Sequence, residues 1–71
     1  MSIDTANYKK LKNEYEKYRE LSTLLLKASD RAIQLNERLI NNIIETLLSE
    51  VQENISMRGF QLGMIKNLEN K

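Results

Sequence analysis

The stretch Leu39–Ile55, LINNIIETLLSEVQENI, carries the densest run of apolar side chains in the chain. Its apolar residues recur at steps of three and four, which on a helix places them in one stripe. They are Leu39, Ile40, Ile43, Ile44, Leu47, Leu48, Val51 and Ile55. Because this stripe is broader than the narrow seam of a two-stranded coiled coil, it predicts packing against more than one neighbouring helix.

The rest of the composition is also typical of long helices. The 71 residues include no Pro and only two Gly, so few positions interrupt a helix. We therefore expect an all-α protein in which long amphipathic helices form a helical hairpin or a coiled-coil bundle. A monomer of this length buries a small fraction of its surface, and the lack of Cys and His excludes disulfides and the usual zinc and haem sites. Oligomerisation or binding to a protein partner is the expected source of further burial.

A first helix is predicted from about residue 5 to about residue 28, with Asp4 or Thr5 as its N-cap. From Tyr8 its apolar positions follow steps of three and four as far as Leu39. One face near its start is rich in tyrosine and forms a possible second contact face, either as a packed seam or as anchors for a partner. This face comprises Tyr8, Leu11, Tyr15 and Tyr18.

The segment LLLKASDRAIQ, residues 24–34, is the candidate turn between two helices. Ser29 or Asp30 could cap a second helix of about residues 30–57. However, no Gly or Pro marks a turn there, and the stripe passes through Ala28, Ala32 and Leu35 with little change of phase. A hairpin and one continuous helix therefore both remain open.

Three asparagines, Asn36, Asn41 and Asn42, interrupt the most apolar part of the chain. An Asn that faces a helical seam can specify register, at some cost in stability. We expect at least two of the three to lie on the outer face of the helix.

Both glycines, Gly59 and Gly63, lie in SMRGFQLGMIKNL, residues 56–68. Gly59 could end the second helix in a left-handed conformation, which would leave a short C-terminal helix of about residues 60–70. Such a segment, with Phe60 as an apolar anchor, would either cap the bundle or bind a partner. Alternatively the second helix continues through both glycines, at a cost of about 1 kcal/mol each relative to Ala.

Arg58 lies within a heptad seam formed by Ile44, Leu48, Val51, Ile55, Leu62 and Ile65. A charged layer in such a seam needs hydrogen-bond partners at the same level, and this requirement can enforce register. The neighbourhood Ile55–Leu62 resembles the central layer of a SNARE motif. That resemblance implies a parallel four-helix bundle with Arg58 in the polar layer. It covers only Ile44–Ile65, and polar residues occupy the layers on either side, so the chain is not assigned to that family.

Charge is unevenly distributed along the sequence. Residues 1–28 carry six basic and four acidic groups. Residues 29–56 carry two basic and five acidic groups, and residues 57–71 carry three basic groups and one acidic group. An acidic middle between two basic ends predicts either pairing within an antiparallel hairpin or pairing between chains in an antiparallel dimer.

No catalytic or cofactor-binding pattern is present. Without Cys or His, the chain lacks a nucleophile and base pair, a metal-ligand spacing and a phosphate-binding glycine loop, so we expect no enzyme, no cofactor and no metal. The basic residues of the first helix are interleaved with Glu, so no nucleic acid is expected as a partner. No transmembrane segment or signal peptide is expected, and we expect a cytoplasmic chain.

The function that fits this pattern is a protein–protein interaction module, a small adaptor or assembly subunit that acts through a helical bundle. The alternative is a small regulatory or inhibitor protein that occludes a target with its aromatic and Met surface, and a SNARE-like bundle helix ranks below both. The partner or oligomer interface is predicted at Leu39, Ile43, Ile44, Leu47, Leu48, Val51, Ile55, Arg58, Phe60, Leu62 and Ile65.

Overall fold

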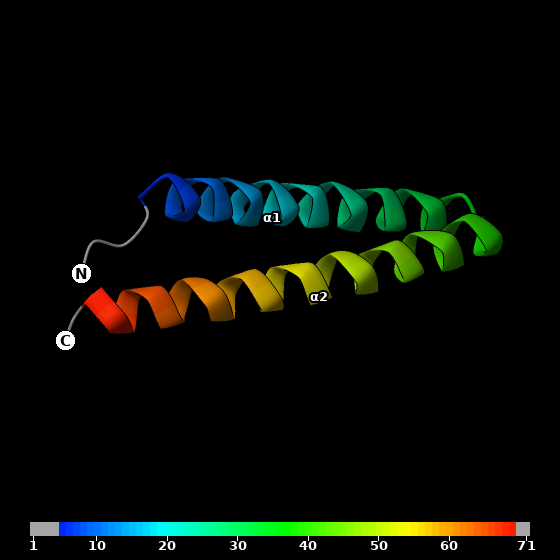
Figure 1. Cartoon of the computed structure of the whole chain (residues 1–71). Helices are drawn as coiled ribbons and strands as arrows, with labels where there is room; N and C mark the ends of the chain where they lie inside the picture. Colours follow the sequence, from blue (N-terminus) through cyan, green and yellow to red (C-terminus); the bar gives the residue numbers. More distant parts are fainter. Residues whose placement is uncertain (1–4, 70–71) are drawn as a thin grey trace.

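The computed structural model describes residues 5–69, and the side chains of residues 6–67, as two helices in an antiparallel hairpin (Figure 1). Helix α1 spans Thr5–Gln34 and helix α2 spans Arg38–Glu69. The molecule is a rod of 55 × 15 × 14 Å. The predicted all-α hairpin is confirmed, and the alternative of one continuous helix is wrong. The first candidate N-cap, Asp4, lies outside the described residues.

The turn lies at residues 35–37, not at Ser29 and Asp30 as predicted. Asn36 adopts a left-handed backbone conformation with φ of 59°. The amide of Asn36 donates to the carbonyl of Ile33 at 3.0 Å, and the amide of Glu37 donates to the carbonyl of Ala32 at 2.9 Å. This pair of bonds is a Schellman motif, which ends α1 and satisfies carbonyl groups that the helix leaves unpaired. Asn is the residue besides Gly that tolerates this conformation best, so the turn needs no glycine.

The two helices pack along the heptad seam of α2. Ile44, Leu48 and Val51 are buried, and they lie closest to the turn end of the seam. On α1 the buried residue is Ala32, and the cluster also includes Leu25 and Ala28. Small side chains on α1 therefore face large ones on α2, which lets the helix axes approach closely near the turn.

Helix α2 continues through both glycines, so the predicted helix boundary at Gly59 and the separate helix of residues 60–70 are wrong. Neither glycine has a positive φ. Gly59 faces α1, where an added Cβ would lie 3.3 Å from Cε1 of Tyr15. Its role is to make room for that ring rather than to end the helix. Residue 70 lies outside the described part of the chain.

One asparagine lies in the interhelical contact. Asn41 is half-buried and Asn42 is exposed on the outer face of α2, whereas Asn36 is exposed in the turn and not on a helix face as expected. The hydroxyl of Ser29 on α1 donates to Oδ1 of Asn41 on α2 at 2.5 Å. This bond links the two helices beside the turn. It also gives a hydrogen-bond partner to a polar side chain that helix packing shields from water.

Candidate interaction surface

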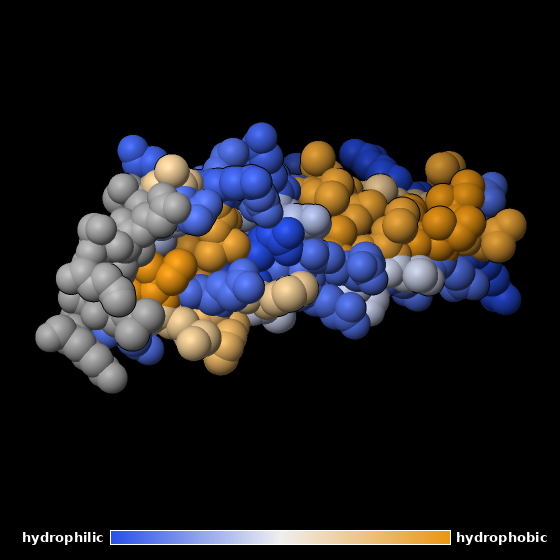
Figure 2. Space-filling view, viewed as in Figure 1, coloured by the Kyte–Doolittle hydropathy of each residue, from blue (hydrophilic) through white to orange (hydrophobic). Residues whose placement is uncertain are grey.

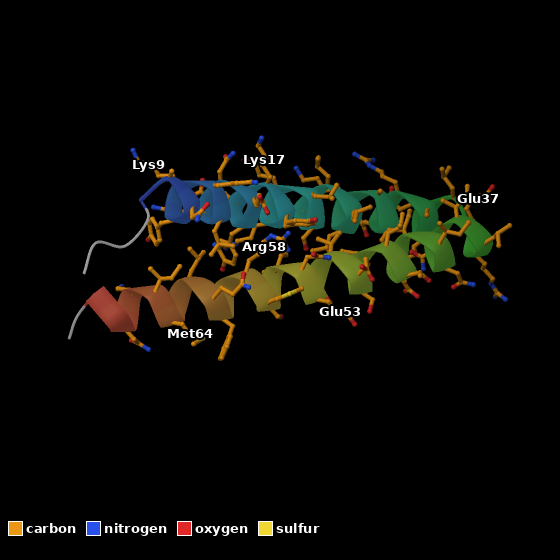
Figure 3. The ribbon with its side chains drawn as sticks, viewed as in Figure 1. Lys9, Lys17, Glu37, Glu53, Arg58 and Met64 are labelled. Carbon is orange, nitrogen blue, oxygen red and sulfur yellow. The ribbon has the colours of Figure 1, made fainter. Side chains whose placement is uncertain are left out.

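Arg58 is the centre of a polar cluster between the helices, toward the open end of the hairpin (Figure 3). Its Nε and Nη2 each donate to Oε2 of Glu14 at 3.2 Å, and its Nη1 donates to Oδ1 of Asn54 at 2.8 Å. The guanidinium lies over the ring of Tyr18, 4.4 Å from its centroid. The Arg58 side chain is only 19% exposed. A charged group buried to this degree is tolerated because its donors are paired and an aromatic face covers it.

The partners of Arg58 therefore all come from the same chain, with Glu14 and Tyr18 on the antiparallel helix α1 and Asn54 on α2 itself. The SNARE resemblance implied instead that three other helices, all parallel, would supply that layer. The charged layer expected at Arg58 is present, but within one hairpin its ion partner is Glu14.

The tyrosine face lies against α2 rather than facing outward. Tyr8, Leu11, Tyr15 and Tyr18 are all half-buried. The ring of Tyr15 is next to Gly59, and the ring of Tyr18 stacks under the guanidinium of Arg58. In the hairpin these rings form the open-end part of the interhelical seam, which is one of the two alternatives considered for them.

The predicted interface residues of α2 divide into two groups. Those facing α1 are Ile44, Leu48, Val51, Ile55, Arg58, Leu62 and Ile65, all buried or half-buried. The helix α1 already covers this group. Leu39, Ile43, Leu47 and Phe60 are 49–72% exposed and remain available for other contacts.

A continuous apolar surface covers one side of the hairpin near the turn. Leu21 and Leu24 of α1 are 42% and 61% exposed. At 100° per residue, the geometry of an antiparallel pair places them on the same side as the exposed apolar residues of α2. We call this surface the apolar face, and it comprises Leu21, Leu24, Leu39, Ile40, Ile43 and Leu47. Figure 2 shows hydrophobic surface gathered over the turn half of this side and a hydrophilic band toward the middle.

Leu21, Leu24 and Ile40 of the apolar face were not among the predicted site residues. The signal for Leu24 was the run Leu24-Leu25-Leu26, because three consecutive leucines cannot all face one neighbouring helix. Leu25 faces α2, whereas Leu26 is 55% exposed on the other side of the hairpin from Leu24. Ile40 was recognised as part of the broad stripe, but only the hairpin shows which edge of that stripe is left uncovered.

The same side of the hairpin is hollowed at the open end. A cavity of about 500 Å³ lies there between the helices, with an apolar lining beside polar side chains. Its lining residues are Asn7, Lys10, Leu11, Glu14, Gln61, Met64 and Ile65. From turn to open end, this side therefore presents the apolar face, then the Arg58 and Glu14 layer, then this cavity.

A second, smaller apolar cluster lies on the outer face of α2. Phe60 is 71% exposed, and Met57 and Met64, three residues before and four residues after it, are 55% and 52% exposed. This spacing puts the three side chains next to one another on the helix surface.

The described residues offer no other recognisable site. They contain no group of three acidic side chains placed to hold a metal ion. Neither helix, over the residues searched, has a stretch long and apolar enough to cross a membrane. No family model, curated protein or solved structure matches the chain.

Proposed function

We propose that this chain is a non-enzymatic protein–protein interaction module, a small adaptor or assembly subunit that packs its apolar face against other helices in a bundle. The observation that carries the proposal is the apolar face itself. Its six large side chains are 42–72% exposed, whereas the buried core of the described residues consists of Ala32, Ile44, Leu48 and Val51. Contiguous apolar surface of this kind marks interaction sites on soluble proteins.

The arrangement of the face supports helices as the partner. Leu39, Ile43 and Leu47 follow one another at intervals of four residues along α2, so they form a ridge. A ridge of this kind packs into the groove of a neighbouring helix. With the row from α1 beside it, the face offers the two-helix surface that one half of a four-helix bundle presents to the other.

Site-specific photo-crosslinking tests the proposal. A benzophenone side chain is placed at position 43, on the apolar face, and in a second variant at position 26 on the opposite side. Ile43 and Leu26 are matched, being apolar and 54% and 55% exposed. In the cells that make the protein, we expect discrete protein adducts from position 43 and few from position 26. Equal adducts from the two positions, or none from position 43, would contradict an interaction through the apolar face.

The exposed cluster around Phe60 supports a second candidate, a small regulatory protein that occludes a target. Phe and Met at such a cluster can anchor a partner, since Met adapts its shape to the surface it meets. Because Phe60 is 71% exposed, Phe60→Ala should leave helicity unchanged by circular dichroism while abolishing target binding. Loss of helicity in this variant would show that Phe60 is a structural residue and would remove this candidate.

A further inference from the structure

The hairpin exposes more surface in total than a compact folded monomer of this mass. The chain has an accessible surface of 5970 Å² and a mass of 8.3 kDa. The scaling of surface with mass gives about 4,600 Å² for a compact monomer of that mass. The excess, roughly 1,400 Å² per chain, lies in the range that each partner buries in an obligate dimer.

The charged layer beside the apolar face is complementary to itself. Arg58 of α2 and Glu14 of α1 lie at one level on neighbouring helices. If a second hairpin packs on this side with both turns at the same end, a two-fold axis runs along the rod and places α1 of each copy over α2 of the other. Each Glu14 then faces the Arg58 of the other copy, and the signs alternate around the layer.

Glu14 has the capacity for this second contact. Both of its bonds with Arg58 use Oε2, and the other oxygen of a carboxylate can accept from a further donor. The Glu14 side chain is also 37% exposed, so it lies at the edge of the hairpin where a second copy would approach. The same axis puts the apolar face of one copy on the apolar face of the other.

We propose that the occupant of the apolar face is a second copy of this chain, which forms a symmetric four-helix bundle with both turns at one end and an alternating layer of two Arg58 and two Glu14 side chains. This inference rests on the proposed function and specifies its partner. The layer fixes the register between the two copies. If one hairpin slid along the other or reversed its direction, a partly buried charge would lie against apolar side chains.

The hairpin brings part of the acidic middle beside the basic first segment. Glu14 lies at the level of Arg58 and Ser29 at the level of Asn41, so residues 44–56 run alongside about residues 15–28. Among the described side chains, however, the ion pair between the helices joins Arg58 and Glu14. A dimer with its turns at opposite ends is the competing arrangement that the experiment must separate from the proposed one.

Two single-cysteine variants of the full chain, Lys9→Cys and Glu37→Cys, distinguish the arrangements. The protein has no other cysteine, both positions are exposed, and they lie near opposite ends of the rod (Figure 3). Sedimentation equilibrium gives the oligomeric state, circular dichroism verifies the helices, and pulsed dipolar spectroscopy of spin labels gives the distance between copies. A label at Glu20, near the middle of α1, serves as a control that is within range in either arrangement.

We expect a dimer in which both end labels are separated by about 30 Å or less, the span of four helices packed at 8–10 Å between axes. A separation near the 55 Å length of the rod at either end would overturn the proposed orientation and the charged layer. A monomer, or an oligomer larger than a dimer, would overturn the inference as a whole. If the chain is monomeric but position 43 still forms adducts with another protein, the proposed function stands and only the second copy is wrong.

Discussion

The two glycines of α2 allow the contact between the helices to be tested with nearly identical substitutions. Gly63 has open space around it, with no atom within 4 Å of the position where a Cβ would be. Gly63→Ala should therefore raise the free energy of unfolding by about 0.4–1 kcal/mol, since Ala is the better helix former and restricts the unfolded chain. Gly59→Ala has the same intrinsic benefit, but its Cβ would lie 3.3 Å from Cε1 of Tyr15.

That distance is shorter than an ordinary van der Waals contact, so the Tyr15 ring must move by a few tenths of an ångström. Inserting a methyl group into a packed contact typically costs about 1–3 kcal/mol. We therefore expect Gly59→Ala to be less stable than Gly63→Ala by about 1 kcal/mol or more. Urea unfolding followed by circular dichroism measures both, at one fixed protein concentration, because any self-association adds to the apparent stability.

A Tyr15→Ala background provides the control. Without the ring there is nothing for the new methyl group to meet, so the two glycine substitutions should stabilise α2 equally in that background. If Gly59→Ala is already as stabilising as Gly63→Ala in the natural sequence, Tyr15 does not press against α2, and the packing described for the open end of the hairpin is incorrect.

Three further predictions concern the turn, the ion pair and the core. Asn36→Val should cost about 1–2 kcal/mol, because a β-branched residue strains a left-handed backbone, whereas Asn36→Gly should not destabilise; equal thermal midpoints for the two variants would refute the turn geometry. A double-mutant cycle of Glu14→Gln and Arg58→Gln should give a coupling of about 0.2–1 kcal/mol in urea unfolding, small because Glu14 is partly exposed, and zero coupling would show that the pair contributes nothing. Leu48→Ala should cost about 2–5 kcal/mol and remove most of the helical circular dichroism signal, and an unchanged signal would mean that the seam is not what holds the hairpin together.

Sequence periodicity was sufficient to identify the helix face that packs. The seven heptad positions from Ile44 to Ile65 are the ones that face α1, because apolar spacing and burial are two expressions of the same helical geometry. Arg58 was likewise identified as a charged layer within that seam. Its partner, Glu14, is 44 residues away along the chain, and no local pattern connects two residues at that separation.

The sequence did not locate the turn. Ser29 and Asp30 have the side chains of a helix cap, but Ser29 bonds to Asn41 across the hairpin instead, so a tertiary contact overrode a local preference. Asn36 was considered only as a seam or outer-face residue of a helix, although it is the residue whose left-handed conformation reverses the chain. The helix end predicted at Gly59 was wrong for a related reason. The sequence alone does not distinguish a glycine that ends a helix from a glycine at a close contact between two helices.

From composition and periodicity alone, this chain had to be helical, with an apolar stripe too broad for one neighbour and with neither Cys nor His. Only the tertiary structure decided which part of that stripe is used within the chain and which part is left outside. The reason is geometric: one helix covers only one face of another, so α1 occupies the heptad seam while Leu39, Ile43 and Leu47 stay on the surface. The position of the turn determines which α1 residues lie beside Leu39, Ile43 and Leu47. That position depends on one asparagine and on contacts between residues far apart in the sequence.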